Sequence, residues 1–297
     1  MHGRSRVRNL LAVVLAILVG AGAASAAELK PKTAEAFDRY VTLTEQRIQS
    51  EIGAGKPFLW VDSRPEPQRQ AAHQRLRAGE LVIERMNTLD QGKRISVPDG
   101  LIHHWMATVF IPNTSMEPVL RLVQDYDRHQ VYYSPDVERS RIITRNGDDF
   151  QILLRFRRTK VITVVVDTYH DVHYGQLDEQ HVYSFSHTTR IQEVENPGKQ
   201  DERERPVGDD HGFLWRLNTY WRLQQADGGV YVQCEAVTLT RDIPTGLGWL
   251  VGPFVEKVPR ESLTFTLAAT RTAIEANAKS STQRAQRNAE ENSHEQQ

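Results

Sequence analysis

The sequence has a single cysteine, Cys234, among its 297 residues. A domain held together by disulfides needs an even set of cysteines, so a disulfide framework is excluded and a hydrophobic core must stabilise the fold. Cys234 lies in the run 230–237, VYVQCEAV, whose alternation is typical of a strand. We expect its thiol to be buried as a small apolar group. The alternative, a nucleophilic thiol, requires a nearby histidine that the sequence does not place.

An excess of charge of one sign is also missing. The chain has 37 lysines and arginines against 38 aspartates and glutamates, a net charge of −1. This balance gives no electrostatic argument for a nucleic-acid partner, and none is expected. The sequence also lacks Gly-x-Ser-x-Gly, His-Glu-x-x-His, a phosphate-binding loop and a dinucleotide fingerprint. These absences argue against the common hydrolases and nucleotide-dependent enzymes, and we expect no cofactor.

Long apolar runs are absent except near the beginning of the chain. Three arginines within residues 4–8 precede an unbroken apolar run over 10–19, and small residues follow as far as Ala26. This order is typical of a secretory signal peptide, and the apolar run is shorter than the about 20 residues that a membrane-spanning helix needs. We therefore expect a signal peptide over 1–26 and an exported protein, either periplasmic or extracellular.

The next hundred residues are the least informative. Apolar positions recur at helical spacing over 33–52, and Gly53, Gly55 and Pro57 follow them. A polar helix-like stretch lies near 67–77. These segments predict a helical N-terminal extension over 27–78.

From residue 79 the apolar residues alternate with period two, which indicates strands. Two hairpin signals, Asn146-Gly147 and Asp227-Gly228-Gly229, join consecutive segments and predict an antiparallel meander. A short helix is expected over 117–125. The expected strands cover residues 80–86, 101–111, 137–144, 150–158, 161–174, 182–194, 212–225 and 230–241.

The C-terminal part predicts one long helix. Over 260–278 one side carries Leu263, Leu267 and Ile274, which indicates an amphipathic helix of about five turns. The last residues, 277–297, are polar and have no apolar anchor, so we expect a disordered tail there.

The order of these elements resembles the START-like superfamily, also called SRPBCC or the helix-grip fold, of polyketide cyclases and lipid-transport proteins. The resemblance covers residues 79–276. It is carried by the runs 107–113 (ATVFIPN), 119–126 (VLRLVQDY) and 133–140 (YSPDVERS), and by 253–274 as the gripping helix. It implies an α+β fold in which a curved antiparallel sheet wraps around the long C-terminal helix and leaves a cavity for an apolar ligand.

Aromatic and aliphatic side chains on single strand faces are the candidates for lining such a cavity. The alternative is that these side chains fill the core completely. The ligand-binding candidates are Trp105, Val109, Phe213, Trp215, Leu217, Trp221, Leu263 and Leu267.

The segment 245–258 is apolar and interrupted by glycine and proline. It is either a tight corner packed on the sheet, or a mobile lid that makes transient membrane contact. The lid or membrane-contact candidates are Leu247, Trp249, Leu250 and Phe254.

Histidine and arginine clusters in the strands are weaker candidates. His170 and His173 differ by an odd number of residues and therefore point to opposite faces of a strand, so no metal site is expected. Arg155 and Arg157 share the face opposite Leu154. We expect that face to be solvated, with contact to an anionic lipid headgroup as the alternative.

The functional prediction is an exported START-like protein that binds or transports a lipid or another apolar small molecule. Two alternatives stay open: a non-catalytic interaction protein with a filled core, and a cyclase-like or hydratase-like enzyme that uses an acid or histidine of the cavity. Asp125, Asp127, His129 and Tyr132 are the acid–base candidates for that enzyme. The sequence leaves the ligand and the oligomeric state open.

Overall fold

The computed structural model describes the backbone of residues 28–53, 55–159, 163–243 and 248–294. Within the last segment, side chains are described for 257–280 and 283. The expected signal peptide lies outside the described residues. Among the described helices, none combines the length and apolar content of a bilayer-spanning segment.

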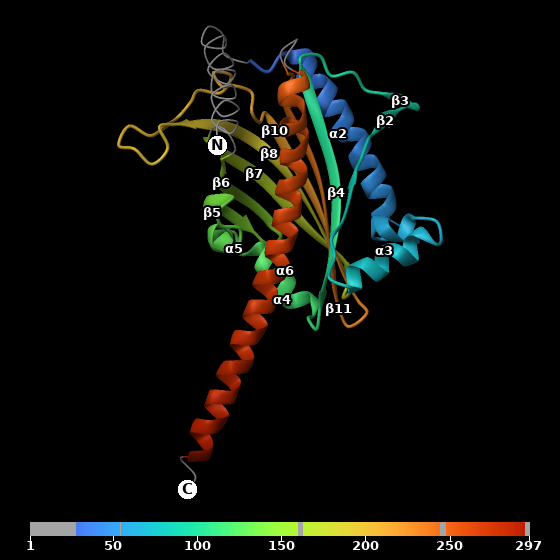
Figure 1. Cartoon of the computed structure of the whole chain (residues 1–297), viewed down its shortest axis with the longest axis vertical. Coiled ribbons are helices and arrows are strands. Elements are labelled where there is room, and N and C mark those ends of the chain that lie inside the picture. The colour runs from blue at the N-terminus through green and yellow to red at the C-terminus, as the bar shows by residue number, and fades with distance from the viewer. Residues whose placement is uncertain (1–27, 54, 160–162, 244–247, 295–297) are drawn as a thin grey trace, which may run out of the picture.

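A nine-stranded antiparallel sheet forms the body of the described chain (Figure 1). The strand order is β1-β4-β11-β10-β8-β7-β6-β5, and β9 pairs with β8 off this path. Its strands are β1 (Val82–Arg85), β4 (Gly100–Pro112), β5 (Val137–Asn146), β6 (Asp149–Thr159), β7 (Thr163–Asp178), β8 (His181–Glu195), β9 (Arg203–Glu204), β10 (Arg216–Ala226) and β11 (Gly229–Arg241). A separate hairpin pairs β2 (Leu89–Asp90) with β3 (Lys93–Arg94).

Helices cover both faces of the sheet. The long helix α6 (Gly248–His294) crosses the inner, concave face and contacts β4, β11 and α4 (Met116–Gln124). Between α4 and β5 lie η2 (Tyr126–Arg128) and α5 (His129–Tyr132). The opposite, outer face is covered by α2 (Pro31–Ile52), η1 (Trp60–Ser63) and α3 (Gln68–Arg77).

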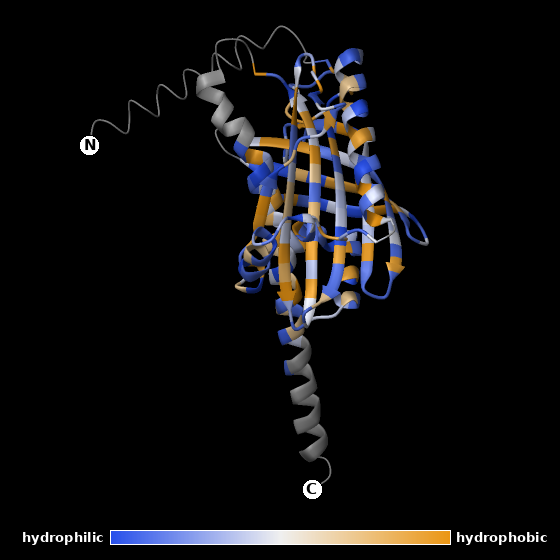
Figure 2. Ribbon diagram, turned by 90° about the vertical axis from the view of Figure 1, so that its right-hand side faces the viewer, coloured by the Kyte–Doolittle hydropathy of each residue, from blue (hydrophilic) through white to orange (hydrophobic). Residues whose placement is uncertain are grey.

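Hydrophobic and hydrophilic residues alternate along the strands (Figure 2), and the buried side chains form separate clusters on the two faces of the sheet. The inner core joins β4 and β11 to α6 through side chains such as Val109, Val232 and Leu267. On the outer face, Phe37 and Ile48 of α2 lie in one cluster with strand residues. The central strands β4 and β11 are therefore buried on both faces, which is uncommon for an antiparallel sheet.

The predicted fold class is confirmed: the structure is α+β, with a curved antiparallel sheet around a C-terminal helix and helices N-terminal to it. The structure differs at the end of the chain, where α6 continues as a helix to His294 instead of ending in an unstructured tail from 277. The physical reason is that the segment is free of glycine and proline and rich in alanine, glutamine, arginine and glutamate, which are good helix formers.

The expectation of a solvated face at Arg155 is wrong. This side chain is 5% exposed, and its guanidinium donates to both carboxylate oxygens of Asp167 at 2.7 and 2.6 Å. It also donates to Glu202 at 2.6 Å, because the segment between β8 and β9 folds back and places that carboxylate beside it. Burial of this arginine is tolerated because two acids accept its hydrogen bonds.

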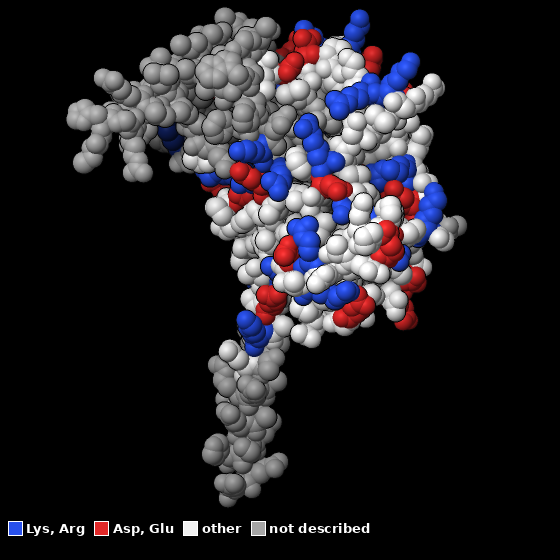
Figure 3. Space-filling model, turned by 45° about the vertical axis from the view of Figure 1, so that its right-hand side comes forward, with Lys and Arg blue, Asp and Glu red and all other residues white. Residues whose placement is uncertain are grey.

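On the surface, positively and negatively charged side chains are interspersed over the face shown in Figure 3.

Candidate ligand-binding site

The inner face of the sheet has a closely packed half and a less closely packed half. In the packed half, Leu263 and Leu267 of α6 meet strand and α4 residues that are almost fully buried, among them Val109 and Val119. These side chains leave little room for a ligand. The packed half therefore serves as the core of the domain.

In the other half, apolar side chains on the same face are only partly buried. Trp105 and Trp221 pack against the inner core and keep part of their surface accessible, and Leu217 is also partly buried. The register explains why they are close: Trp105 lies opposite Ala236, and Ala236 lies opposite Thr219, two residues from Trp221. We call Trp105, Leu217, Thr219, Trp221 and Ala236 the inner patch.

A neutral imidazole lies on the inner face beyond the patch. Thr168 donates its hydroxyl proton to the carbonyl of Leu154 at 2.9 Å, so it accepts at 2.8 Å from Nε2–H of His170. The Nδ1 atom of His170 then accepts from the Ser186 hydroxyl at 3.2 Å. Burial lowers the pKa of His170 to about 3, and this histidine is uncharged at neutral pH.

A second histidine lies at the opposite side of the patch. His103 is paired in register with Thr238, and its Nε2 lies 3.2 Å from Oγ1 of Thr240. Burial, together with the charge of Arg85, lowers the pKa of His103 to about 4. The Thr238 hydroxyl is buried and has no hydrogen-bond partner among the described residues.

Tyrosine hydroxyls tie the short helices to the sheet and to α6. Tyr174 donates to the carbonyl of Val123 at 3.2 Å, so it accepts from Tyr126 at 2.8 Å. The Tyr133 and Thr270 hydroxyl oxygens lie 3.1 Å apart, which connects the end of α5 to α6. Burial raises the pKa of Tyr126, Tyr133 and Tyr174. These phenols are therefore neutral hydrogen-bonding groups.

Six of the eight predicted ligand-binding residues lie on the inner face of the sheet or on the side of α6 that packs against it. Three of them, Val109, Leu263 and Leu267, belong to the packed half. Three others, Trp105, Leu217 and Trp221, belong to the inner patch.

The structure places the other two predicted residues elsewhere. Trp215 lies in the outer-face cluster with Leu239, and its Nε1 donates to Asp210 at 3.1 Å. Phe213 is 42% exposed, with its ring beside that of His211. The reason is that β10 begins at Arg216, so these two residues precede the strand and do not follow its alternation.

The predicted lid cannot be placed by its side chains. Leu247 lies outside the described residues. The backbone of Trp249, Leu250 and Phe254 belongs to the first turns of α6, but their side chains also lie outside the described part. The lid and its membrane contact therefore stay predictions.

The acid–base candidates of the enzyme hypothesis connect helices to a strand. Tyr132 donates to Asp125 at 2.6 Å, and Asp127 accepts from the backbone N–H of Ile142 at 2.8 Å. His129 is buried between tyrosine rings. The hydrogen bond from Ile142 to Asp127 holds η2 against β5, whereas the buried Nε2 atom of His129 has no hydrogen-bond partner among the described residues.

His170 and His173 of β7 lie on opposite faces of the sheet, as their odd separation along the strand predicts. His170 points inward, whereas His173 is exposed and lies 2.7 Å from Asp149. Within the described ranges, no group of three histidine, cysteine or acidic side chains has the geometry of a metal site.

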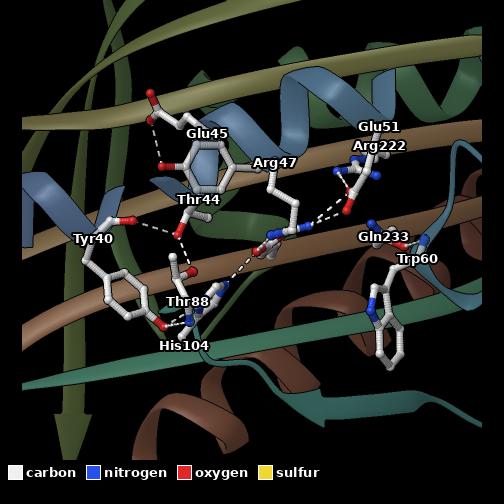
Figure 4. A network of polar contacts seen from close by, with 12 residues as sticks. Tyr40, Thr44, Glu45, Arg47, Glu51, Trp60, Thr88, His104, Arg222 and Gln233 are labelled. Atoms are coloured by element: carbon white, nitrogen blue, oxygen red, sulfur yellow. Dashed lines mark hydrogen bonds and ion pairs between the residues drawn. The ribbon is translucent and has the colours of Figure 1, made fainter. Parts of the chain in front are cut away.

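Sequence reasoning missed a buried polar network between α2 and the outer face (Figure 4). Tyr40 accepts from the backbone N–H of Thr88 at 2.8 Å, so its own hydroxyl donates to Nδ1 of His104 at 2.8 Å. His104 therefore carries its proton on Nε2 and donates to Glu235 at 2.5 Å. Arg47 of α2 also contacts Glu235.

The network continues along α2. Arg47 pairs with Glu51 at 2.9 Å, and Glu51 accepts from Arg222 at 2.6 Å. Burial opposes ionisation of Glu235, but the hydrogen bond from His104 and the charges of two arginines outweigh burial and lower its pKa. The only sequence signal was that bulky or charged residues occupy both faces of β4, β10 and β11.

No protein-family model matches this sequence, and the search of curated proteins finds no match. Similar solved structures include a STAR-related lipid transfer protein from Xanthomonas axonopodis, with 14% identity and a TM-score of 0.42 over 65% of this chain and 98% of that one. Human STARD10 has 10% identity and a TM-score of 0.43, over 73% of this chain and 84% of that one. The Zhui aromatase/cyclase from Streptomyces sp. R1128 has 12% identity and a TM-score of 0.40, over 60% and 96%. The sheet order and the enclosed helix of this chain themselves show a helix-grip architecture, a curved antiparallel sheet around a long C-terminal helix.

Proposed function

We propose that this protein binds an apolar, lipid-like molecule between the inner patch and α6. The observation that carries the proposal is the partial exposure of Trp105, Trp221 and Leu217 on a face whose other half is close-packed. Apolar surface left in contact with water costs about 25 cal/mol per Å². A ligand that covers these side chains removes that cost and gains dispersion contacts.

The surroundings of the patch favour binding over chemistry. His170 is hydrogen-bonded to hydroxyl groups rather than to an acid, and burial keeps it neutral. Among the acid–base candidates of the enzyme hypothesis, Tyr132 donates to Asp125, and Asp127 accepts from the backbone of Ile142. Burial lowers the pKa of His129 to about 4 and keeps it neutral. A carrier needs only a shaped apolar site, and no residue of the patch has to transfer a proton.

The proposal includes the place of action. The arginine-flanked apolar run before Ala26 supports export, so the protein would carry its ligand in the periplasm or outside the cell. An apolar molecule in those compartments needs a protein that shields it from water.

Native mass spectrometry of the mature protein, purified without detergent, tests the proposal. We expect a discrete adduct of lipid-like mass on the wild type and its loss in Trp105→Ala and Trp221→Ala. Phe213→Ala is the matched control, because this aromatic residue is exposed and lies off the inner patch. Circular dichroism establishes that each variant is folded. A clean apo mass that persists after incubation with total membrane lipid would refute the proposal and leave the interaction protein with a filled core.

A further inference from the structure

We infer that the ligand is an uncharged molecule whose hydroxyl or carbonyl groups hydrogen-bond to a neutral polar band on the inner face, and not a lipid with a charged headgroup. The inference rests on the proposed function of this site and names its ligand class. The neutral polar band consists of His103, Thr168, His170, Ser186, Thr219 and Thr238.

Sheet register places the band across the inner face. His103 of β4 is opposite Thr238 of β11, and Thr219 of β10 is opposite Ser186 of β8. The side chain of Ser186 then contacts His170 of β7. The band thus crosses five neighbouring strands and passes the inner patch, since Trp105 and Trp221 each lie two residues from a member of the band on the same strand.

The band carries no charge at neutral pH. Four of its members are hydroxyl residues, and burial keeps the two imidazoles neutral, with a pKa of about 4 for His103 and about 3 for His170. A phosphate or carboxylate at the band would lose its hydration, and no member of the band is a cation. Arg85 lies at the β1 margin, in register with Trp105, and is exposed to solvent. Both ring nitrogens of His170 are already bonded within the band, to Thr168 and Ser186. A ligand hydroxyl or carbonyl would exchange a hydrogen bond with water for one with a group that is still available, such as the Thr238 hydroxyl.

Two ionic side chains at the margins of the inner face, Glu193 and Arg158, already have partners in the protein. Glu193, on the inner side of β8, accepts from both the backbone N–H and the Nδ1 atom of His211, at 2.9 and 2.6 Å. Arg158, at the end of β6, pairs with Asp136 at 2.6 Å. The exposed Arg85 of edge strand β1 acts on His103 by helping to lower its pKa, which favours the neutral imidazole.

The Thr238 hydroxyl points to a polar group on the ligand. Thr238 is 9% exposed, and its Oγ1 has no partner among the described residues. A buried hydroxyl without a partner is unfavourable, and its two strand neighbours on this face, His103 and Leu217, do not bond to it. A ligand hydroxyl or carbonyl beside Thr238 supplies the missing bond while its apolar body covers the tryptophans.

Three probes that share one oleoyl chain and differ in the head test this inference: 1-monooleoylglycerol, oleate and oleoyl lysophosphatidate. Each is titrated at neutral pH, below its critical micelle concentration, with tryptophan fluorescence as the readout. We expect the neutral glyceride to bind at least about tenfold more tightly than either anion, because each anion has to give up the hydration of its charge at an uncharged band. Equal or tighter binding of an anionic probe overturns the uncharged ligand class and leaves the proposed function intact.

Variants of Thr238 locate the polar contact. Thr238→Val keeps the side-chain shape and removes the hydroxyl, and we expect a loss of about tenfold in glyceride affinity. Thr238→Ser should restore affinity, and Thr272→Val, at an exposed position of α6, should not change it. Unchanged glyceride affinity in a folded Thr238→Val protein refutes the contact. Failure of every oleoyl probe to bind, together with a clean apo mass, removes the proposed function itself.

Discussion

His104 and Trp105 are consecutive in β4 and lie on opposite faces of the sheet. His104 donates to Glu235 in the polar network beneath α2, whereas Trp105 belongs to the inner patch. The same arrangement occurs at Arg222 and Trp221 in β10. The network on the outer face is thus directly behind the patch on the inner face, and α2 holds in place the strands that carry the patch.

Replacing Glu235 with glutamine should destabilise the protein. Glu235→Gln removes one of the two carboxylates that face Arg47 and Arg222, and an unbalanced buried charge costs about 3 kcal/mol. Urea denaturation followed by circular dichroism measures this loss. The control is Glu117→Gln, since the Glu117–Arg121 pair is exposed on both sides and should contribute less than about 1 kcal/mol. Equal stability of Glu235→Gln and wild type would show that the network does not hold α2 on the sheet.

Stability should fall as the pH is lowered from neutral. His103 and His170 accept protons in the unfolded chain near pH 6.5, but in the folded protein only near pH 4 and pH 3. The unfolded state therefore binds more protons over this range, and each histidine reduces the free energy of unfolding by up to about 1.4 kcal/mol per pH unit. The lowered pKa of Glu235 adds a loss in the same direction at more acidic pH.

Denaturation midpoints measured from pH 7 to pH 4 test this dependence. His170→Gln should flatten the slope, because its amide does not titrate. His173→Gln is the control for the substitution itself, because the His173 side chain is 56% exposed. An identical slope in wild type and His170→Gln would contradict the buried, neutral state of His170.

Loss of the Arg155 side chain should release the segment between β8 and β10. Arg155→Met leaves Asp167 buried without its bidentate partner, at a cost of about 3 kcal/mol, and frees Glu202. Trypsin should then cleave faster after Lys199 within this segment. Arg203→Met is the control, because the side chain of Arg203 is 75% exposed. Unchanged proteolysis of Arg155→Met would show that other contacts hold the segment.

The two halves of the inner face should respond differently to truncation. Leu267→Ala in the packed half should cost about 3 kcal/mol, because it opens a cavity among close-packed side chains. Leu217→Ala in the inner patch should cost less than about 1.5 kcal/mol, since Leu217 is already partly accessible. Urea denaturation of ligand-free protein compares them. Equal losses would indicate that the patch is packed as tightly as the core.

Much of the architecture followed from periodicity in the sequence. The antiparallel sheet was predicted by the period-two alternation of β4 and β11 and by the hairpin residues Asn146-Gly147. The helix that the sheet encloses was predicted by the helical spacing of Leu263, Leu267 and Ile274. These signals are local: each lies within a single segment of the chain, so it can be recognised without knowing which other segments that segment contacts.

The features that the sequence did not predict depend on long-range partners. Nothing near Glu235 indicates that Arg47, 188 residues away, will pair with it. Trp215 was misplaced because alternation is reliable only inside a strand, and β10 begins one residue later. The burial of Arg155 depends on a loop that returns from β8.

The burial of β11 on both faces limits the routes by which a ligand can reach the inner patch. Strands of the core open at the highest free energies in a domain, close to that of global unfolding, and β11 is covered in this way by α2 on one face and by α6 on the other. Parting the central strands to admit a ligand would therefore amount to unfolding. The sheet is then a fixed wall, and the proposed ligand would have to enter at its rim, between the sheet and α6.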